Sequence, residues 1–190
     1  MAAGLTPEQA LAVWRDAELL CTPAQVEAAL ERLAATITGQ LQSCNPLVLV
    51  VMNGALIPGA QLLLRLTFPL QVGYLHATRY RSGVRGGAID WIAPPRPTVA
   101  GRTVLVVDDI YDEGDTLKAI LDTLRQDGAA AVYSAVLVNK RHARKVAGLT
   151  VDFVGLEVPD RYVFGCGMDY QEYWRQLPAI YALRESAPST

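Results

Sequence analysis

Two short aliphatic runs constrain the fold more than any other feature of the sequence. Residues 47–51 read LVLVV, and residues 104–107 read VLVV. Strands that are apolar at every position, instead of at alternate positions, are typical of a parallel sheet covered by helices on both faces. Each run is followed by a turn and then by apolar residues at helical spacing. This alternation predicts an α/β domain with a mostly parallel central sheet.

The other elements are predicted from helix caps, apolar spacing and chain breakers. Thr6-Pro7-Glu8-Gln9 and Thr22-Pro23-Ala24-Gln25 have the form of capping boxes, so two helices should begin there. The glycine-rich residues 81–87 should form a mobile loop between two strands. We also expect strands at 70–80, 131–138 and 151–154, a strand that ends at 94–97, and helices at 57–66 and 117–124.

The composition excludes several classes of protein. The chain is 51% hydrophobic and 19% charged with a net charge of −2, which gives no electrostatic reason to expect a nucleic-acid or membrane partner. Cys21, Cys44 and Cys166 are far apart and form no CxxC pair, so neither a disulfide framework nor a structural zinc site is indicated. The sequence lacks a basic leader and any apolar run of roughly 20 residues, and we therefore expect a cytoplasmic protein.

An acidic turn follows the second aliphatic run. The segment 104–117 reads VLVVDDIYDEGDTL and holds five carboxylates within eight residues. Ligands of open parallel sheets bind beyond the carboxyl ends of the strands, where this turn lies. Asp108 and Asp109 suit vicinal hydroxyls or Mg²⁺, while Gly114 and Thr116 open a helix whose free N–H groups suit a phosphate. A diol beside a phosphate describes a ribose 5-phosphate.

The acidic turn is also compatible in outline with three other kinds of site. A calcium loop that starts at Asp109 fails, because Tyr111 and Ile120 would occupy positions that need oxygen ligands. A receiver domain is disfavoured, because only about eighty residues follow the acidic pair, too few for its remaining strands and helices. A plain acidic helix cap stays open on the turn alone, since carboxylates favour helix N-termini.

Two segments resemble a known family. VLVVDDIYDEGDTL resembles the phosphoribosyl diphosphate signature of type I phosphoribosyltransferases. Residues 158–170, VPDRYVFGCGMDY, are similar to the closing segment of hypoxanthine-guanine phosphoribosyltransferases. The resemblance covers about 47–183 and implies the type I phosphoribosyltransferase fold, with helices flanking the sheet and a small hood formed by the N- and C-terminal segments. We expect one domain over 1–190, with N-terminal helices (1–44), a core (45–155) and the C-terminal hood segment (156–185).

The resemblance also implies a reaction. Family members transfer the 5-phosphoribosyl group from phosphoribosyl diphosphate to N9 of hypoxanthine or guanine, with Mg²⁺, and release pyrophosphate with IMP or GMP. Two alternatives stay open, a xanthine-preferring transferase and a non-catalytic regulator that binds phosphoribosyl diphosphate. Family members are commonly homodimers or homotetramers, and we expect the same here.

The family's site residues carry over by position. Asp112 would be the base at purine N7, Asp108 and Asp109 would bind the ribose hydroxyls, and both would hold Mg²⁺ together with Asp169. The 5-phosphate residues would be Asp112, Glu113, Gly114, Asp115 and Thr116. The purine residues would be Lys140, Tyr162 and Val163. The pyrophosphate residues would be Met52, Asn53, Gly54 and Arg175. Arg79 and Tyr80 would belong to a flexible loop over the site.

Four positions depart from the family pattern. Asn53 stands where many relatives carry Lys or Arg, and Arg79 stands where many carry Ser. Glu113 replaces a hydroxyl residue in the phosphate loop, and Asp115 adds an acid beside a dianion. We expect both acidic side chains to point to solvent while their backbone N–H groups bind, because those groups do not depend on side-chain identity. The family often has a non-proline cis peptide in the pyrophosphate loop, which residues 52–54 would form here.

Overall fold

A six-stranded sheet with the order β4-β3-β2-β5-β6-β7 forms the centre of the molecule. The computed structural model describes residues 4–79 and 89–184, so the predicted loop at 81–87, and Tyr80, lie outside the described ranges. Neighbouring strands pair in parallel, except that β4 runs antiparallel to β3. The mostly parallel sheet is therefore confirmed. Its strands are β2 (Leu47–Val51), β3 (Gln71–Arg79), β4 (Ile89–Arg96), β5 (Thr103–Tyr111), β6 (Ala131–Arg141) and β7 (Phe153–Pro159).

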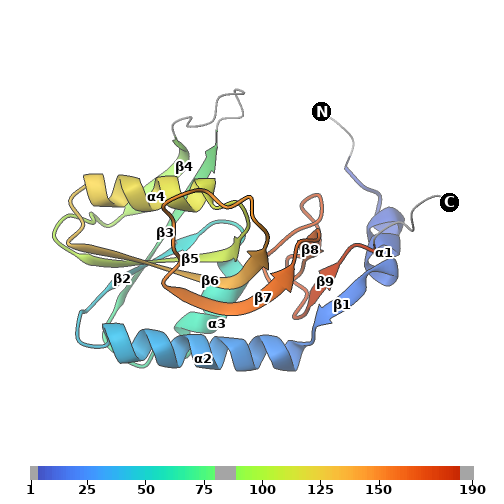
Figure 1. Ribbon diagram of the computed structural model, residues 1–190, viewed down its shortest axis with the longest axis horizontal. Helices are drawn as coiled ribbons and strands as arrows, with labels where there is room; N and C mark the ends of the chain where they lie inside the picture. The colour runs from blue at the N-terminus through green and yellow to red at the C-terminus, as the bar shows by residue number, and fades with distance from the viewer. Residues whose placement is uncertain (1–3, 80–88, 185–190) are drawn as a thin grey trace.

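Helices cover both faces of this sheet, as Figure 1 shows. On one face, α2 (Pro23–Leu41) and α3 (Leu56–Leu63) pack against side chains such as Val48 and Leu105. On the other face, α4 (Asp115–Gln126) packs against Leu49 and Val106. Successive side chains of a strand point to opposite faces, so a strand buried on both faces must be apolar throughout. This double burial explains the two aliphatic runs.

The helix starts are those that the capping boxes predicted. In α2 the Thr22 hydroxyl accepts a hydrogen bond from the backbone N–H of Gln25 at 3.3 Å, and the Gln25 side chain accepts one from the Thr22 N–H at 2.8 Å. The same reciprocal pair joins Thr6 and Gln9 at the start of α1 (Pro7–Asp16). Because both caps satisfy N–H groups that would otherwise lack partners, they fix where each helix begins.

The two ends of the chain form a hood beside the main sheet (Figure 1). Its small sheet has the order β1-β9-β8 and joins β1 (Glu18–Cys21), β9 (Ile180–Ala182) and β8 (Val163–Phe164). Trp14 of α1 packs on Trp174 with ring centroids 5.3 Å apart, and the indole N–H of Trp174 donates to the Ala10 carbonyl at 3.0 Å. The expected hood is present, although its strands are too short to be recognised from sequence.

The strands that lead to the acidic turn are longer than the sequence predicted. β5 continues through Asp108 and Asp109 to Tyr111, and β6 continues to Arg141. The predicted ends at 107 and 138 were wrong because the two backbones go on pairing, with Tyr111 opposite Asn139, whatever side chains they carry. Asp108 and Asp109 therefore lie inside the strand and do not leave it as expected.

Two further boundaries differ from their predictions. The strand expected at 151–154 is β7, Phe153–Pro159, which pairs with the second half of β6 from Ala135 to Arg141. The helix expected at 57–66 is α3, which ends at Leu63. Beyond it, the N–H groups of Arg65 and Leu66 donate to the carbonyls three residues earlier, in a tightened turn. Among the described residues, no helix is long and apolar enough to cross a bilayer.

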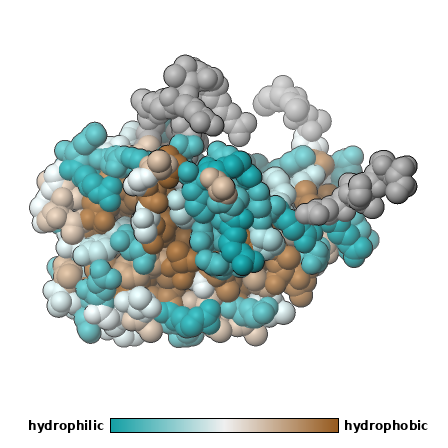
Figure 2. Space-filling model, viewed as in Figure 1, coloured by the Kyte–Doolittle hydropathy of each residue, from teal (hydrophilic) through white to brown (hydrophobic). Residues whose placement is uncertain are grey.

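The packing of α2 on the sheet can be tested with two leucines. Leu30 of α2 is 1% exposed, whereas Leu64, just after α3, is 83% exposed. Hydrophobic areas also lie between hydrophilic ones on the face drawn in Figure 2, so surface leucines are not unusual here. Leu30→Ala should lower the free energy of unfolding by about 2–5 kcal/mol, because it leaves a cavity under the sheet.

The matched control is Leu64→Ala, which should change the free energy of unfolding by less than about 0.5 kcal/mol. Urea denaturation of both variants gives the comparison. Equal losses in the two variants would contradict the docking of α2.

Candidate active site

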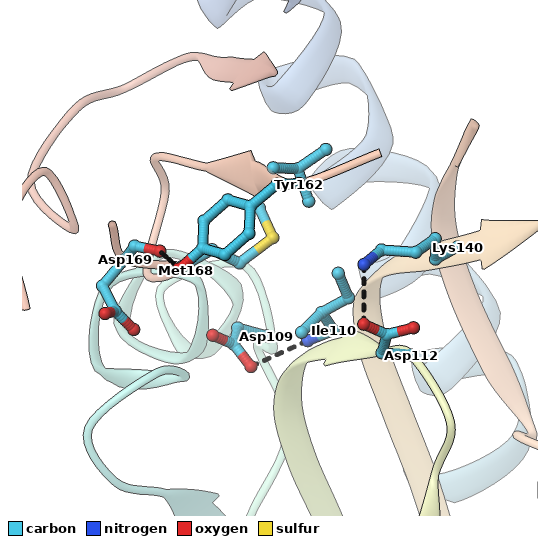
Figure 3. Close-up of a pocket in the computed structure, with 8 residues that line it drawn as sticks. Asp109, Ile110, Asp112, Lys140, Tyr162, Met168 and Asp169 are labelled. Carbon is cyan, nitrogen blue, oxygen red and sulfur yellow. Dashed lines mark hydrogen bonds and ion pairs between the residues drawn. The ribbon is translucent and has the colours of Figure 1, made fainter. Parts of the chain in front are cut away.

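Two adjoining hollows lie at the carboxyl ends of β5 and β6. The first, of about 230 Å³, is drawn in Figure 3. Its wall consists of Asp109, Ile110, Asp112, Lys140, Tyr162, Val163, Met168 and Asp169. The second, of about 300 Å³, lies where α4 begins. Its wall consists of Asp108, Ile110, Asp112, Glu113, Gly114, Asp115, Thr116 and Leu117. Ile110 and Asp112 belong to both walls, so one ligand with two parts could occupy both hollows.

Asp112 lies between two basic side chains. Its Oδ2 is 2.6 Å from Lys140 Nζ, the pair joined by a dashed line in Figure 3, and its Oδ1 is 2.6 Å from His142 Nε2. Burial alone would raise the pKa of Asp112, but the hydrogen bonds from Lys140 and His142 and the charge of Lys140 outweigh it and hold the pKa below its ordinary value. Asp112 is therefore held as an anion.

His142 was not predicted as a site residue, because the sequence showed it only within a basic run. Its side chain is 3% exposed and directed at Asp112. The alternation of side chains could have indicated this position, since residues two apart on an extended chain point to the same side. Lys140 was predicted for the site, and His142 is two residues after it.

The pair Asp108 and Asp109 has a different environment. Asp108 accepts the backbone N–H of Asp109 at 3.0 Å, and Asp109 accepts that of Ile110 at 2.8 Å. Removal from water raises the pKa of both carboxyls, most strongly for Asp108, where the neighbouring Asp109 charge adds to the effect. A cation or hydroxyl donors at this point would relieve the repulsion.

The donor set fits Mg²⁺, a hard cation that takes oxygen ligands. Within the described residues, however, no three His, Cys, Asp or Glu side chains gather as a complete metal site. Asp169 lines the same hollow as Asp109, but its carboxylate is held by Arg175 at 2.7 Å and by the Glu172 N–H at 2.8 Å. Mg²⁺ commonly binds one or two carboxylates and completes its shell with water and substrate phosphates, which this arrangement permits.

Tyr162 supplies an aromatic wall to the first hollow. It is half exposed, its hydroxyl donates to the Asp169 carbonyl at 3.2 Å, and its ring meets Tyr170 edge-on at 5.6 Å. An accessible aromatic ring in a hollow is suited to stacking on a flat ligand. Val163 and Met168 complete this wall, and Met168 was not predicted.

The second hollow has features that suit an anion. Gly114, with φ 88°, precedes α4, and no side chain caps the helix start, so its N–H groups face the hollow. A Cβ at Gly114 would overlap the Tyr111 ring, so the close turn needs glycine. Glu113 lies 3.7 Å from Arg144, and the side chains of both are exposed, in agreement with the expectation that Glu113 points away.

Lys145 supports this loop from behind. Its Nζ lies 3.4 Å from the Tyr111 ring centroid and donates to the carbonyls of Tyr111 and Asp112 at 3.0 and 3.2 Å. The Val146 N–H also donates to the Glu113 carbonyl at 2.8 Å. The segment after β6 therefore holds the acidic turn in place.

The predicted pyrophosphate residues lie close to the acidic pair but line neither of these two hollows. The Met52–Asn53 peptide is cis, as the family resemblance implied. A Cβ at Gly54 would overlap the Asp109 carboxylate, and one at Gly167 would overlap the Gly54 carbonyl. Two glycines thus allow the 52–54 turn, β5 and the hood to meet.

Arg175 lies in the hood and binds groups of the hood itself. Its guanidinium contacts Asp169 and Glu172, at 2.7 and 3.2 Å, and donates to the Gly167 carbonyl at 2.9 Å. Its charge also lowers the pKa of Asp109, against the larger effect of burial. Arg79 ends β3, and Tyr80 is not among the described residues.

Comparison with known proteins identifies the family. The phosphoribosyl transferase domain matches residues 20–172. This chain belongs to the phosphoribosyltransferase family. The Bacillus subtilis hypoxanthine-guanine phosphoribosyltransferase is 33% identical over 168 residues, which cover 88% of this chain and 93% of the relative. The hypoxanthine-guanine-xanthine phosphoribosyltransferase of Tritrichomonas foetus is 30% identical over 85% of this chain and 88% of the relative.

Solved structures give the same result. A hypoxanthine phosphoribosyltransferase from Staphylococcus aureus has a TM-score of 0.85 at 26% identity, and the match covers 91% of this phosphoribosyltransferase and 95% of that chain. The family and the fold class predicted from the two motifs are confirmed.

The contact between Gly54 and Asp109 can be tested in the phosphoribosyltransferase. Gly54→Ala should force Asp109 aside and weaken binding of phosphoribosyl diphosphate with Mg²⁺ by roughly 10-fold or more, since hydrogen bonds to a charged group are disturbed. Isothermal titration calorimetry measures this change.

Gly39→Ala is the matched control, because an added Cβ in α2 meets nothing within 4 Å. It should leave binding unchanged and stabilise the helix by about 1 kcal/mol at most. Wild-type affinity in Gly54→Ala would contradict the role given to this close approach.

Proposed function

We propose that this phosphoribosyltransferase acts in purine salvage. It would transfer the 5-phosphoribosyl group from phosphoribosyl diphosphate to N9 of hypoxanthine or guanine, giving IMP or GMP and pyrophosphate. One observation carries the proposal: Asp112 belongs both to the hollow with Lys140 and Tyr162 and to the hollow at the start of α4. A base-binding wall and an anion site thus share one carboxylate, as a nucleotide product requires.

The proposed reaction needs one proton transfer at Asp112. A bond forms between purine N9 and ribose C1′, while the bond from C1′ to the pyrophosphate oxygen breaks and its electron pair leaves with pyrophosphate. The N7 proton of the purine becomes more acidic as the new bond forms, and it passes to Asp112. The lowered pKa of Asp112 means that the carboxylate is an anion before the purine arrives, as a proton acceptor must be.

Lys140 would select a 6-oxopurine. Its side chain is mostly buried, and its ammonium group already lies 2.6 Å from Asp112. A purine with its N7 at Asp112 would bring O6 toward the same ammonium group, which then shares its hydrogens between two acceptors. A 6-amino group offers no acceptor there and leaves part of the buried charge unsatisfied. Tyr162 would stack on the ring, and Val163 would contact its edge.

The phosphoribosyl diphosphate would lie across both hollows. Backbone groups of residues 112–116 would bind the 5-phosphate, and Asp108 and Asp109 would bind the ribose hydroxyls. When bound, Mg²⁺ would neutralise charge on the departing pyrophosphate, held through Asp108 and Asp109 with Asp169 nearby. Met52, Asn53, Gly54 and Arg175 would face the pyrophosphate, which requires Arg175 to leave Asp169 in part.

We also propose a cytoplasmic location. All three cysteines are free thiols, which suits a reducing cytoplasm.

On the basis of the family resemblance, we further propose a homodimer or homotetramer. Light scattering after gel filtration would measure the mass of the assembly. A regulator that binds without turnover is less well supported, because the residues that the family resemblance assigns to the base, the purine and the phosphate all line the two hollows.

Nucleotide formation with each purine tests the proposal directly. Purified protein, Mg²⁺ and phosphoribosyl diphosphate are incubated separately with hypoxanthine, guanine, xanthine and adenine. Formation of IMP and GMP is the expected result. Preference for xanthine would favour the alternative transferase, and binding of phosphoribosyl diphosphate without any product would favour the regulator.

The base assignment has its own test. Asp112→Asn should lower kcat by about 10²–10⁴-fold, because no carboxylate remains to accept the N7 proton. Binding of phosphoribosyl diphosphate should change much less. Asp122→Asn, on the exposed side of α4, is the control and should keep full activity. Undiminished turnover in Asp112→Asn would remove the assignment.

The specificity assignment is tested at Lys140. Lys140→Ala should reduce the ratio of kcat/KM for hypoxanthine to that for adenine by about 10-fold or more, because the donor to O6 is lost. Lys118→Ala, which removes a lysine paired only with Asp122 among the ion pairs of the described residues, serves as the control. An unaltered ratio in Lys140→Ala would refute the contact with O6.

A further inference from the structure

The second partner of Asp112 has no role in the reaction described so far. His142 follows the last residue of β6, and its Nε2 is 2.6 Å from Asp112 Oδ1. Lys140 is bound to the other oxygen, Oδ2. The imidazole is buried at 3% exposure, whereas the Asp112 side chain is 44% exposed and faces both hollows. One oxygen of the carboxylate is thus held from within the protein by a side chain that does not line either hollow.

The second ring nitrogen of His142 fixes which tautomer is present. The backbone N–H of Arg144 donates to His142 Nδ1 at 3.1 Å. Since Nδ1 accepts a hydrogen bond, it carries no proton, and the proton of the neutral ring must lie on Nε2. Nε2 therefore donates to Asp112 Oδ1. A doubly protonated ring would lose the bond from Arg144.

We propose that His142 is a positioning residue for the catalytic base, Asp112. His142 would hold Oδ1 of the Asp112 carboxylate while Oδ2 releases Lys140 in part and turns to the purine. The inference rests on the proposed role of Asp112 as the base at N7. Lys140 must turn partly toward O6 when a 6-oxopurine binds, so it cannot be a constant partner of the carboxylate. His142 has no contact with the two hollows and keeps its hydrogen bond throughout.

The charges around His142 agree with this role. Asp112 faces its Nε2, and Lys140 and Asp160 are the other charged groups near this cluster. Arg144, whose backbone holds Nδ1, directs its guanidinium to Asp160 and Glu113. Lys145 donates to the backbone carbonyl of Asp112. The neighbours of His142 are thus joined to one another, and its N–H is the group directed at the base.

Two substitutions separate the N–H group from the bulk of the ring. His142→Leu removes the donor but fills most of the space, whereas His142→Gln retains an N–H donor at a similar distance from the backbone. We expect kcat for IMP formation to fall by roughly 10-fold or more in His142→Leu, the effect of one hydrogen bond to a charged group. In His142→Gln most of this activity should be restored. KM for phosphoribosyl diphosphate should stay near the wild-type value in both.

The pH profile gives a readout that a purely structural role would not move. Donation from His142 helps to keep the pKa of Asp112 low, so its removal raises that pKa. Activity requires the anion, and it is lost as pH falls through the pKa. The acid limb of kcat/KM should therefore move to higher pH in His142→Leu and stay in place in His142→Gln.

A spectrum of the wild-type protein tests the tautomer without any variant. The chain has two histidines, so long-range proton–nitrogen correlation spectra of wild type and His76→Gln assign both rings. We expect a neutral His142 protonated at Nε2. Protonation at Nδ1 in the neutral ring would overturn the inference, even if His142→Leu failed to fold. The melting temperature of each variant reports its folding.

The outcomes distinguish this inference from the proposed function. Equal losses in the Leu and Gln variants, or a wild-type kcat and pH profile in His142→Leu, would overturn the role of His142. If Asp112→Asn kept full turnover, the base assignment itself would fail. A loss in Asp112→Asn without any loss in His142→Leu would retain the base and remove its positioning residue.

Discussion

The parallel pairing of β5 with β6 is the constraint on which the site depends. It sets Tyr111 opposite Asn139 and thereby brings Asp112 beside Lys140, although 28 residues separate them. The aliphatic halves of both strands are buried against helices on two faces, so a one-residue slip would exchange the side chains that pack against the two helical layers and disrupt that close packing. The geometry of the proposed chemistry is therefore a consequence of core packing.

The carboxylates of one short turn are stabilised in different ways. Asp112 has two basic partners and a lowered pKa, whereas Asp108 and Asp109 have raised pKa values and accept hydrogen bonds from backbone N–H groups. Electrostatics thus separates a carboxylate that is charged in advance, the proposed base, from a pair that favours a cation or hydroxyl groups. Neighbouring residues of one motif can serve separate chemical roles because their surroundings differ.

Sequence alone predicted the parts of the fold that depend on local physics. Capping boxes and double burial are local, and the starts of α1 and α2, as well as β2, were predicted correctly. The ends of β5 and β6 were not predicted correctly, because hydrogen bonding between neighbouring backbones does not depend on the pattern of apolar and polar side chains. The motifs indicated most of the residues that line the two hollows, but they did not single out Met168, whose position depends on the hood. They also missed His142, which contacts Asp112 from outside the hollows and whose position depends on strand register.

The hood ties the beginning of the chain to the aromatic wall of the first hollow. The Tyr173 hydroxyl donates to the Leu5 carbonyl at 2.7 Å, and the Trp174 indole donates to the Ala10 carbonyl. Tyr162, in the wall of the first hollow, lies eleven residues before Tyr173 in the same C-terminal segment. The start of α1 therefore helps to hold the segment that carries Tyr162, whose ring would stack on the substrate. An affinity tag or fusion partner joined at the amino terminus could therefore disturb the position of Tyr162 in the first hollow. The acidic turn is anchored in the main sheet and should keep its position.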